Sequence, residues 1–213
     1  MMDLSEKQWV KHVVFHPFEG FEDMRWKKSG SLKISFFIVF LFFAGNIVSD
    51  RLYAFHFWNS YDKLFNIVPY IVKSILLFAV WVIGNWAVCT LFSGEGTLRR
   101  ICIFSAYSLI PYVASLYLTT ILSHFLITDE GVFISCIHYA GVLWSFLLMF
   151  NAIKTVHQYS FLKTAAAMLL TVAAMLIMMF LLVLVMSLFQ KVGLFIYSIY
   201  IFSITTGERG LSR

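Results

Sequence analysis

The chain has few charged residues for its length. Charged side chains make up 13% of its 213 residues, whereas hydrophobic side chains make up 61%. A water-soluble domain carries about 25% charged residues, so this chain has too few to cover a globule in water. We therefore expect lipid to be its solvent. Only helices and closed barrels satisfy their backbone hydrogen bonds in lipid, and the unbroken apolar runs favour helices.

The sequence motifs of common enzymes are also absent. There is no H-E-x-x-H, no G-x-S-x-G and no pair of acidic residues inside an apolar run. The loop "SGEGTLRR" lacks the G-x-x-x-x-G-K-[ST] pattern of a phosphate-binding loop, and we expect a hairpin whose glycines permit a tight reversal. Its three cysteines, Cys89, Cys102 and Cys136, lack ligand spacing and are interpreted as apolar filler. We expect a protein that is not an enzyme and that holds no cofactor and no metal.

Five apolar runs are long enough to cross a membrane. A helix needs about 20 apolar residues to cross the hydrocarbon core. The candidate spans are roughly 32–48, 68–92, 101–125, 132–153 and 164–189. Because the connections between them are short, consecutive spans are expected to be antiparallel neighbours. The sequence predicts an all-α integral membrane protein, a bundle of five transmembrane helices in a single membrane domain over 1–213.

The basic residues suggest an orientation. Lys and Arg are enriched in the cytoplasmic connections of membrane proteins. A cytoplasmic N-terminus places ten of the sixteen basic residues on that side, and the external connection at Asp129 and Glu130 then carries none. We predict a multi-pass protein with its N-terminus cytoplasmic and its C-terminus outside. These flanks explain the net charge of +5, so no nucleic-acid binding is expected.

Both ends of the chain are expected to lie at the membrane surface. In 1–30, Trp9, Val10, Val13 and Val14 form one face of a first amphipathic helix, and Pro17 separates it from a second. At the other end, 190–213 contains only about thirteen consecutive apolar residues. We expect this tail to form an interfacial helix or to prolong the fifth span, and a sixth crossing over 192–204 stays open.

Several polar residues lie inside the spans or at their cytoplasmic ends. Polar side chains are costly in lipid, so they usually face protein or water. Two interpretations stay open. The residues form hydrogen bonds between helices, each worth about 0.6 kcal/mol, or they line an inward-facing cavity. The residues concerned are Asn85, Tyr107, Ser108, Asn151, Lys154 and His157, and Pro111 removes a helix hydrogen bond nearby in the third span.

Three segments resemble the bacterial branch of the Yip family, the Ypt-interacting-protein domain. They are "HPFEGFEDMRWKKSGSLK", "NWAVCTLFSGEGTLRRICIFSAYSLIPY" and "LWSFLLMFNAIKTVHQYSFLKT". The resemblance implies a bundle of five spans in the bacterial plasma membrane. Eukaryotic members are associated with Rab GTPases and vesicle traffic, and bacterial members are often encoded beside sugar-importing ABC transporters. The matching motif positions are His16, Pro17, Phe18, Gly20, Phe21, Asn85, Trp86, Gly94, Glu95, Gly96, Tyr107, Pro111, Trp144, His157 and Gln158.

Two classes of function follow from these observations. The first is an accessory or scaffold protein that binds membrane machinery, such as an ABC transporter permease, through the N-terminal helices and the hairpin bearing Glu95 and Arg99. The second is a transporter or channel for a small molecule or ion that uses the polar cluster as its path. The first is favoured, because no span carries an acidic residue at its centre. Both classes of function are compatible with a homo-oligomer. The C-terminal end of the chain, "SIYIFSITTGERGLSR", departs from the family pattern.

Overall fold

Helices account for the regular secondary structure of the described residues, 6–27, 29–54 and 65–211 of this computed structural model. Five helical segments are long and apolar enough to cross a membrane. They are Leu32–Arg51, Val68–Leu91, Leu98–Ser123, Gly131–His157 and Phe161–Tyr200. Even the shortest, with 20 residues, is about 30 Å long, which matches the hydrocarbon core. The predicted all-α bundle of five spans is confirmed.

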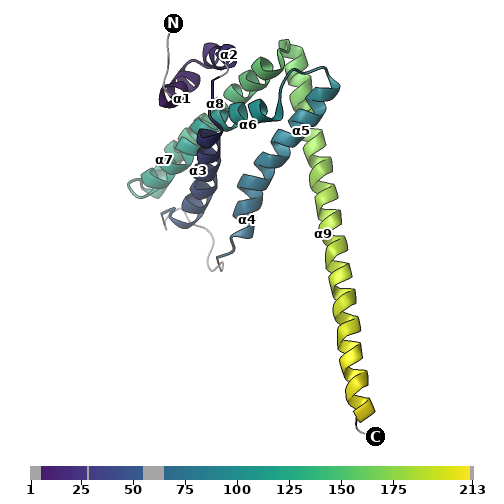
Figure 1. Ribbon diagram of the computed structural model, residues 1–213. Helices are drawn as coiled ribbons and strands as arrows, with labels where there is room; N and C mark the ends of the chain where they lie inside the picture. Colours follow the sequence, from purple (N-terminus) through teal and green to yellow (C-terminus); the bar gives the residue numbers. More distant parts are fainter. Residues whose placement is uncertain (1–5, 28, 55–64, 212–213) are drawn as a thin grey trace. The chain divides into compact units, whose positions relative to one another are not determined.

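Two short helices precede the spans. Helix α1 is Glu6–Phe15 and helix α2 is Glu19–Trp26 (Figure 1). Pro17 lies between these bounds, as expected. The predicted apolar face of α1 is correct, since Trp9 and Val13 are buried. In α2, Glu19 and Glu22 lie in the first turn and Arg25 in the last, so the charges complement the helix dipole.

The first two spans are α3 and a composite helix. Helix α3 is Leu32–Arg51. The second span begins with α4, Val68–Ile71, continues through a π-helical segment, Val72–Leu76, and ends with α5, Leu77–Leu91. Ser74 in the π-helical segment is buried and accepts a hydrogen bond from the Asn46 side chain of α3 at 3.2 Å. This bond joins the two spans on their polar side.

The third span, predicted as one run, is divided into two helices near Pro111. Helix α6 is Leu98–Ser108 and helix α7 is Ile110–Ser123, and Pro111 lies in the first turn of α7. That position needs no N–H group, so proline fits there. The Tyr112 N–H instead donates to Ser145 Oγ at 2.8 Å. Ser145 belongs to α8, Gly131–His157, which follows a 3₁₀ turn at Thr128–Glu130 and packs against both α6 and α7.

The last helix, α9, runs without a break over Phe161–Leu211. The tail therefore has the second of its two expected forms, a prolongation of the fifth helix, and no turn creates a separate sixth helix over 192–204. The chain divides into two compact units, Met1–Val172 and Ala173–Arg213. In the described part of the second unit there is one helix only, and over 173–200 many of its large apolar side chains are exposed.

The main core of the first unit joins the N-terminal helices to the spans. Its buried members come from α1, α2, α3, α5, α6 and α8. Phe21 of α2 is fully buried, and its ring stacks on that of Phe104 of α6 with centroids 5.4 Å apart. A second cluster around Phe42, Val113 and Leu116 joins α3 to α7. The N-terminal helices are thus part of the folded bundle and not only a surface appendage.

Candidate functional site at the hairpin

Two glycines hold the hairpin between α5 and α6 against the end of α8. A Cβ atom on Gly94 would lie 2.4 Å from His157 Nδ1, and one on Gly96 would lie 2.5 Å from His157 Cε1. The glycines are expected from the sequence to ease the reversal of the chain. In the structure, the left-handed backbone conformation falls on Ser93, with φ 56°. Gly94 and Gly96 instead make room for the His157 ring.

A chain of hydrogen bonds passes through His157. Its Nδ1 atom lies 3.3 Å from the Gly96 backbone nitrogen, and its Nε2 atom lies 3.1 Å from Asn85 Oδ1. Because the Gly96 N–H only donates, Nδ1 accepts, and the ring proton is on Nε2, which donates to Asn85. Asn85 Nδ2 then donates to Thr171 Oγ1 at 3.2 Å, and that hydroxyl donates to the Ala167 carbonyl at 2.7 Å. This chain connects the hairpin, α5, α8 and the start of α9.

Tyr159 closes the same site and was not singled out from the sequence. Its ring stacks on His157 with centroids 5.3 Å apart. Its hydroxyl lies 3.0 Å from the Cys89 carbonyl oxygen and 3.1 Å from that of Phe92, so it donates to the end of α5. Burial, followed by the neighbouring Cys89, raises the pKa of Tyr159 to about 12. The phenol therefore remains a hydrogen-bond donor at neutral pH.

The hairpin also contacts the N-terminal helices. Arg25 Nη2 of α2 donates to Glu95 Oε2 at 2.6 Å. Exposed ion pairs contribute little, about 0–1 kcal/mol, and the Glu95 side chain is 66% exposed. Burial of Phe21 and Met24 therefore holds α2 in place, and the ion pair fixes the position of the hairpin tip relative to α2. Two sequence motifs separated by 70 residues thus form one surface.

The other N-terminal motif residues occupy different positions. His16 and Phe18 are exposed, Pro17 is half-buried and Gly20 is buried. A Cβ atom on Gly20 would lie 2.7 Å from Val13 Cα, so this glycine permits the close approach of α1 and α2. Trp144 Nε1 of α8 donates to the Val14 carbonyl of α1 at 3.0 Å. Trp144 is therefore a contact of the N-terminal segment and not of the hairpin.

The remaining polar residues do not join the His157 chain. Asn151 donates to the Leu147 carbonyl of its own helix at 3.0 Å. Ser108 donates to the Ser105 carbonyl at 2.7 Å, and Tyr107 is fully buried in the main core. Lys154 is half-buried and Trp86 is exposed on α5. Of the predicted inner cluster, Asn85 and His157 are brought together by one hydrogen bond.

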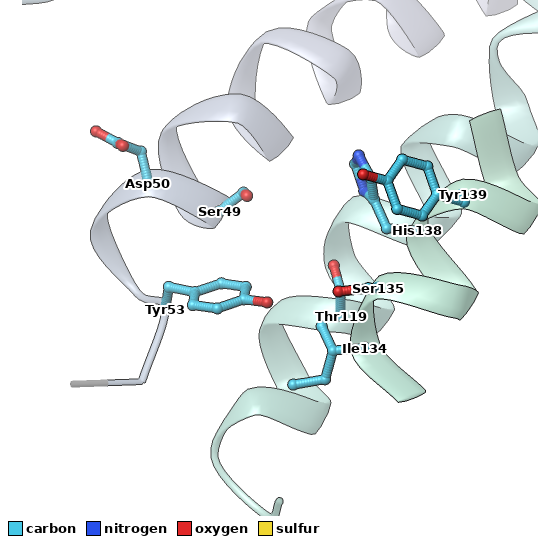
Figure 2. A pocket seen from close by; sticks show the side chains of 8 residues that line it. All are labelled: Ser49, Asp50, Tyr53, Thr119, Ile134, Ser135, His138 and Tyr139. Atoms are coloured by element: carbon cyan, nitrogen blue, oxygen red, sulfur yellow. The ribbon is translucent and has the colours of Figure 1, made fainter. Parts of the chain in front are cut away.

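A second polar site lies at the opposite end of α8. A cavity of about 360 Å³ opens between the ends of α3, α7 and α8. Figure 2 shows Tyr53, Ser135 and His138 around this space, while the Asp50 carboxylate points away from it. That carboxylate accepts a hydrogen bond from the Tyr70 hydroxyl. The sequence gives little sign of this site, because its members are single polar positions in three separate runs. Its lining residues are Ser49, Asp50, Tyr53, Thr119, Ile134, Ser135, His138 and Tyr139.

In the described part of the chain, no three or more His, Cys, Asp or Glu side chains lie together in a group that could hold a metal ion. The cysteines Cys89, Cys102 and Cys136 are all free thiols.

Comparison with known families agrees with this architecture. The model of the Yip1 domain matches residues 11–185, which include α2, the hairpin, the His157 chain and most of the five spans. Comparisons with curated proteins and with solved structures gave no match. Because the family match covers most of the chain and the five apolar helices fit it, the chain belongs to the Yip1 domain family of multi-pass membrane proteins.

Proposed function

We propose that this protein is a non-enzymatic scaffold that binds other membrane proteins through the surface formed by α2 and the hairpin. The family suggests a link with membrane trafficking. The observation that carries the proposal is the Arg25–Glu95 contact, which joins two motifs distant in sequence at one end of the bundle. A trafficking or transport component is the proposed partner class. An ABC sugar-importer permease is the first candidate, from the gene association of bacterial relatives.

The surface around this contact has the features of a protein interface. Trp26, which follows Arg25 at the end of α2 and lies outside the five candidate spans, is 80% exposed. An exposed aromatic side chain beside a charged pair is typical of binding surfaces. The hydrogen bonds of Asn85 and His157 keep the hairpin in one conformation, which lowers the entropy cost of binding.

The proposed orientation places this surface in the cytoplasm of a bacterial cell. The N-terminal helices, the hairpin and the end of α8 meet at one end of the bundle, since Gly96 bonds His157 and Glu95 bonds Arg25. That end carries Arg25, Arg99, Arg100 and Lys154, in agreement with the positive-inside distribution. The opposite end of the bundle is proposed to face outward.

A charge-reversal experiment tests the scaffold. The tagged protein is purified in mild detergent from cells that contain the candidate permease, and recovery of the permease is measured. We expect Glu95→Arg and Arg25→Glu each to lower recovery, since each places two like charges at the contact, and the double exchange to restore it. His12 of α1 and Asp23 of α2, whose side chains form a hydrogen bond at 2.9 Å, supply the control exchange. Equal recovery from all variants at equal abundance would contradict a role for this surface.

The transporter alternative has a separate readout. The purified protein in liposomes is expected to give no substrate flux above that of empty liposomes. The buried ends of Asn85 and His157 bond to each other and to Gly96 and Thr171, which supports the proposal that this cluster joins helices and does not line a substrate path. Flux that is lost in an Asn85→Leu variant would favour the alternative.

A further inference from the structure

A cavity of about 400 Å³ lies between α2 and the start of α6. The cationic residues Arg25, Arg99 and Arg100 line it together with the hydroxyl-bearing Ser29 and Thr97. Met24, Ile103 and Phe104 supply apolar lining, and Met24 and Phe104 are buried. Gly30 is the remaining lining residue. Its φ is 103°, and a Cβ atom there would lie 2.8 Å from Ile103 Cγ2. The cavity therefore combines cations and hydroxyls with an apolar part.

The positive charge of this cavity is incompletely compensated. Glu95 pairs with Arg25, whereas Arg99 and Arg100 take part in none of the ion pairs among the described residues. Both lie in the first turn of α6, where the helix dipole is positive, and that turn has no acidic residue. Two guanidinium groups at a positive helix end repel each other and the dipole. A bound anion would remove this repulsion.

An apolar groove lies beside the cavity along the same helix. Its volume is about 390 Å³, and it is lined by α3, the second span and α6. All its lining residues are apolar, and they include Phe40 of α3, Ala79 of the second span, and Leu98 and Cys102 of α6. Leu98 and Cys102 precede the cavity residues Arg99 and Ile103 by one position each. The cavity and the groove therefore flank the first two turns of α6, one cationic and one apolar.

We infer that the start of α6 binds one anionic phospholipid, with its phosphate in the arginine cavity and an acyl chain in the groove. A phosphate group matches the planar donor fork of arginine and forms charge-assisted hydrogen bonds with it. The site lies at the end of a candidate span, where phospholipid headgroups are found, and basic pockets there select anionic lipids. Because the groove is apolar and begins one residue from the cations, the ligand is a lipid and not a free phosphate.

The first experiment tests the cationic part of the site. The full chain, purified in a neutral detergent, is titrated with phosphatidylglycerol and with phosphatidylcholine, and lipid adducts are counted by native mass spectrometry. We expect phosphatidylglycerol to bind at least about tenfold more tightly, a difference of about 1.4 kcal/mol. Arg99→Gln combined with Arg100→Gln should abolish this preference. Lys154→Gln combined with Lys163→Gln removes two cations at the same end that do not line the cavity and should preserve it.

A second experiment distinguishes a lipid from a free phosphate. Inorganic phosphate is titrated against the same protein, and Ala79→Phe fills the groove while leaving the arginines intact. We expect inorganic phosphate to bind far more weakly than phosphatidylglycerol, and Ala79→Phe to weaken phosphatidylglycerol binding. Leu98→Gln, which places an amide in the groove, is a second variant should Ala79→Phe fold poorly by circular dichroism. Unchanged preference in the double arginine variant, or equal binding of inorganic phosphate, would overturn the inference.

Discussion

At the residue scale, His157 determines how the hairpin is attached. It is one of the few polar side chains that is both buried and bonded to two other segments, the hairpin through Gly96 and α5 through Asn85. In an apolar environment an unsatisfied polar group costs about 1–3 kcal/mol. The stability of this site therefore depends on every hydrogen bond in the series from Gly96 through His157 and Asn85 to Thr171.

Replacement of His157 by phenylalanine tests this dependence. The side chain remains an aromatic ring, but the ring has no nitrogen atoms, so Asn85 Oδ1 and the Gly96 N–H lose their hydrogen-bond partner. We expect the free energy of unfolding to fall by about 1–3 kcal/mol, measured as a lower thermal midpoint in detergent. Combining it with Asn85→Leu should recover part of the loss, because the orphaned amide is removed. His124→Phe, at an exposed position, is the control, and an equal midpoint for His157→Phe and the unmodified protein would contradict the prediction.

The hairpin glycines provide a second test at this scale. A Cβ atom at Gly96 would meet His157 and Val156 at 2.5 and 2.6 Å, whereas one at Gly193 would meet nothing within 4 Å. We expect Gly96→Ala to lower the thermal midpoint and to displace the hairpin. Gly193→Ala, inside helix α9, should be neutral or stabilising by up to about 1 kcal/mol. A stable Gly96→Ala protein would show that the hairpin is not seated on His157.

At the element scale, the break between α6 and α7 sets how the third span packs. Pro111 lies in the first turn of α7, and the Tyr112 N–H that follows it donates to Ser145 of α8. The divided helix thus depends on a hydrogen bond from another span. A serine that bonds only within its own helix would not support the break between α6 and α7.

A serine pair on α8 tests this dependence. We expect Ser145→Ala to destabilise the protein by about 1–3 kcal/mol, because the Tyr112 N–H is left without its partner. Ser135→Ala is the matched control on the same helix, since Ser135 is exposed and bonds only to the Gly131 carbonyl. Thermal midpoints of the two variants in the same detergent provide the comparison. Equal midpoints would mean that the break is held by packing alone.

At the scale of the whole molecule, five apolar helices and an uneven distribution of basic residues predict one orientation in the membrane. An odd number of spans places the two ends of the chain on opposite sides. Ser93, in the hairpin, and Asp129, before α8, are both exposed and lie in connections at opposite ends of the bundle. They are therefore suitable positions for labelling.

Cysteine labelling with a reagent that does not cross membranes tests the orientation. In a variant that lacks Cys89, Cys102 and Cys136, we expect Asp129→Cys to react in intact cells. Ser93→Cys should react only after the membrane is opened. Reaction of Ser93→Cys in intact cells would reverse the proposed orientation and would move the α2–hairpin surface outside the cell.

The sequence by itself determined the features that depend on residues close together along the chain. The scarcity of charge requires lipid as solvent, and the length of each apolar run gives the number of spans. Pro17 and Pro111 mark the helix breaks because a missing N–H acts locally. The apolar face of α1 likewise follows from the spacing of Trp9 and Val13.

The pairing of distant side chains was decided only by the tertiary structure. Asn85 meets His157 and Thr171, and Arg25 meets Glu95, across 70 to 86 residues of sequence. Such pairs depend on the rotation of each helix about its axis. Helices α8 and α9 are apolar on nearly all faces, so hydropathy cannot determine that rotation. The position of Tyr159 and the cavities beside α3 and α6 depend on the same packing, because several helices form each of them.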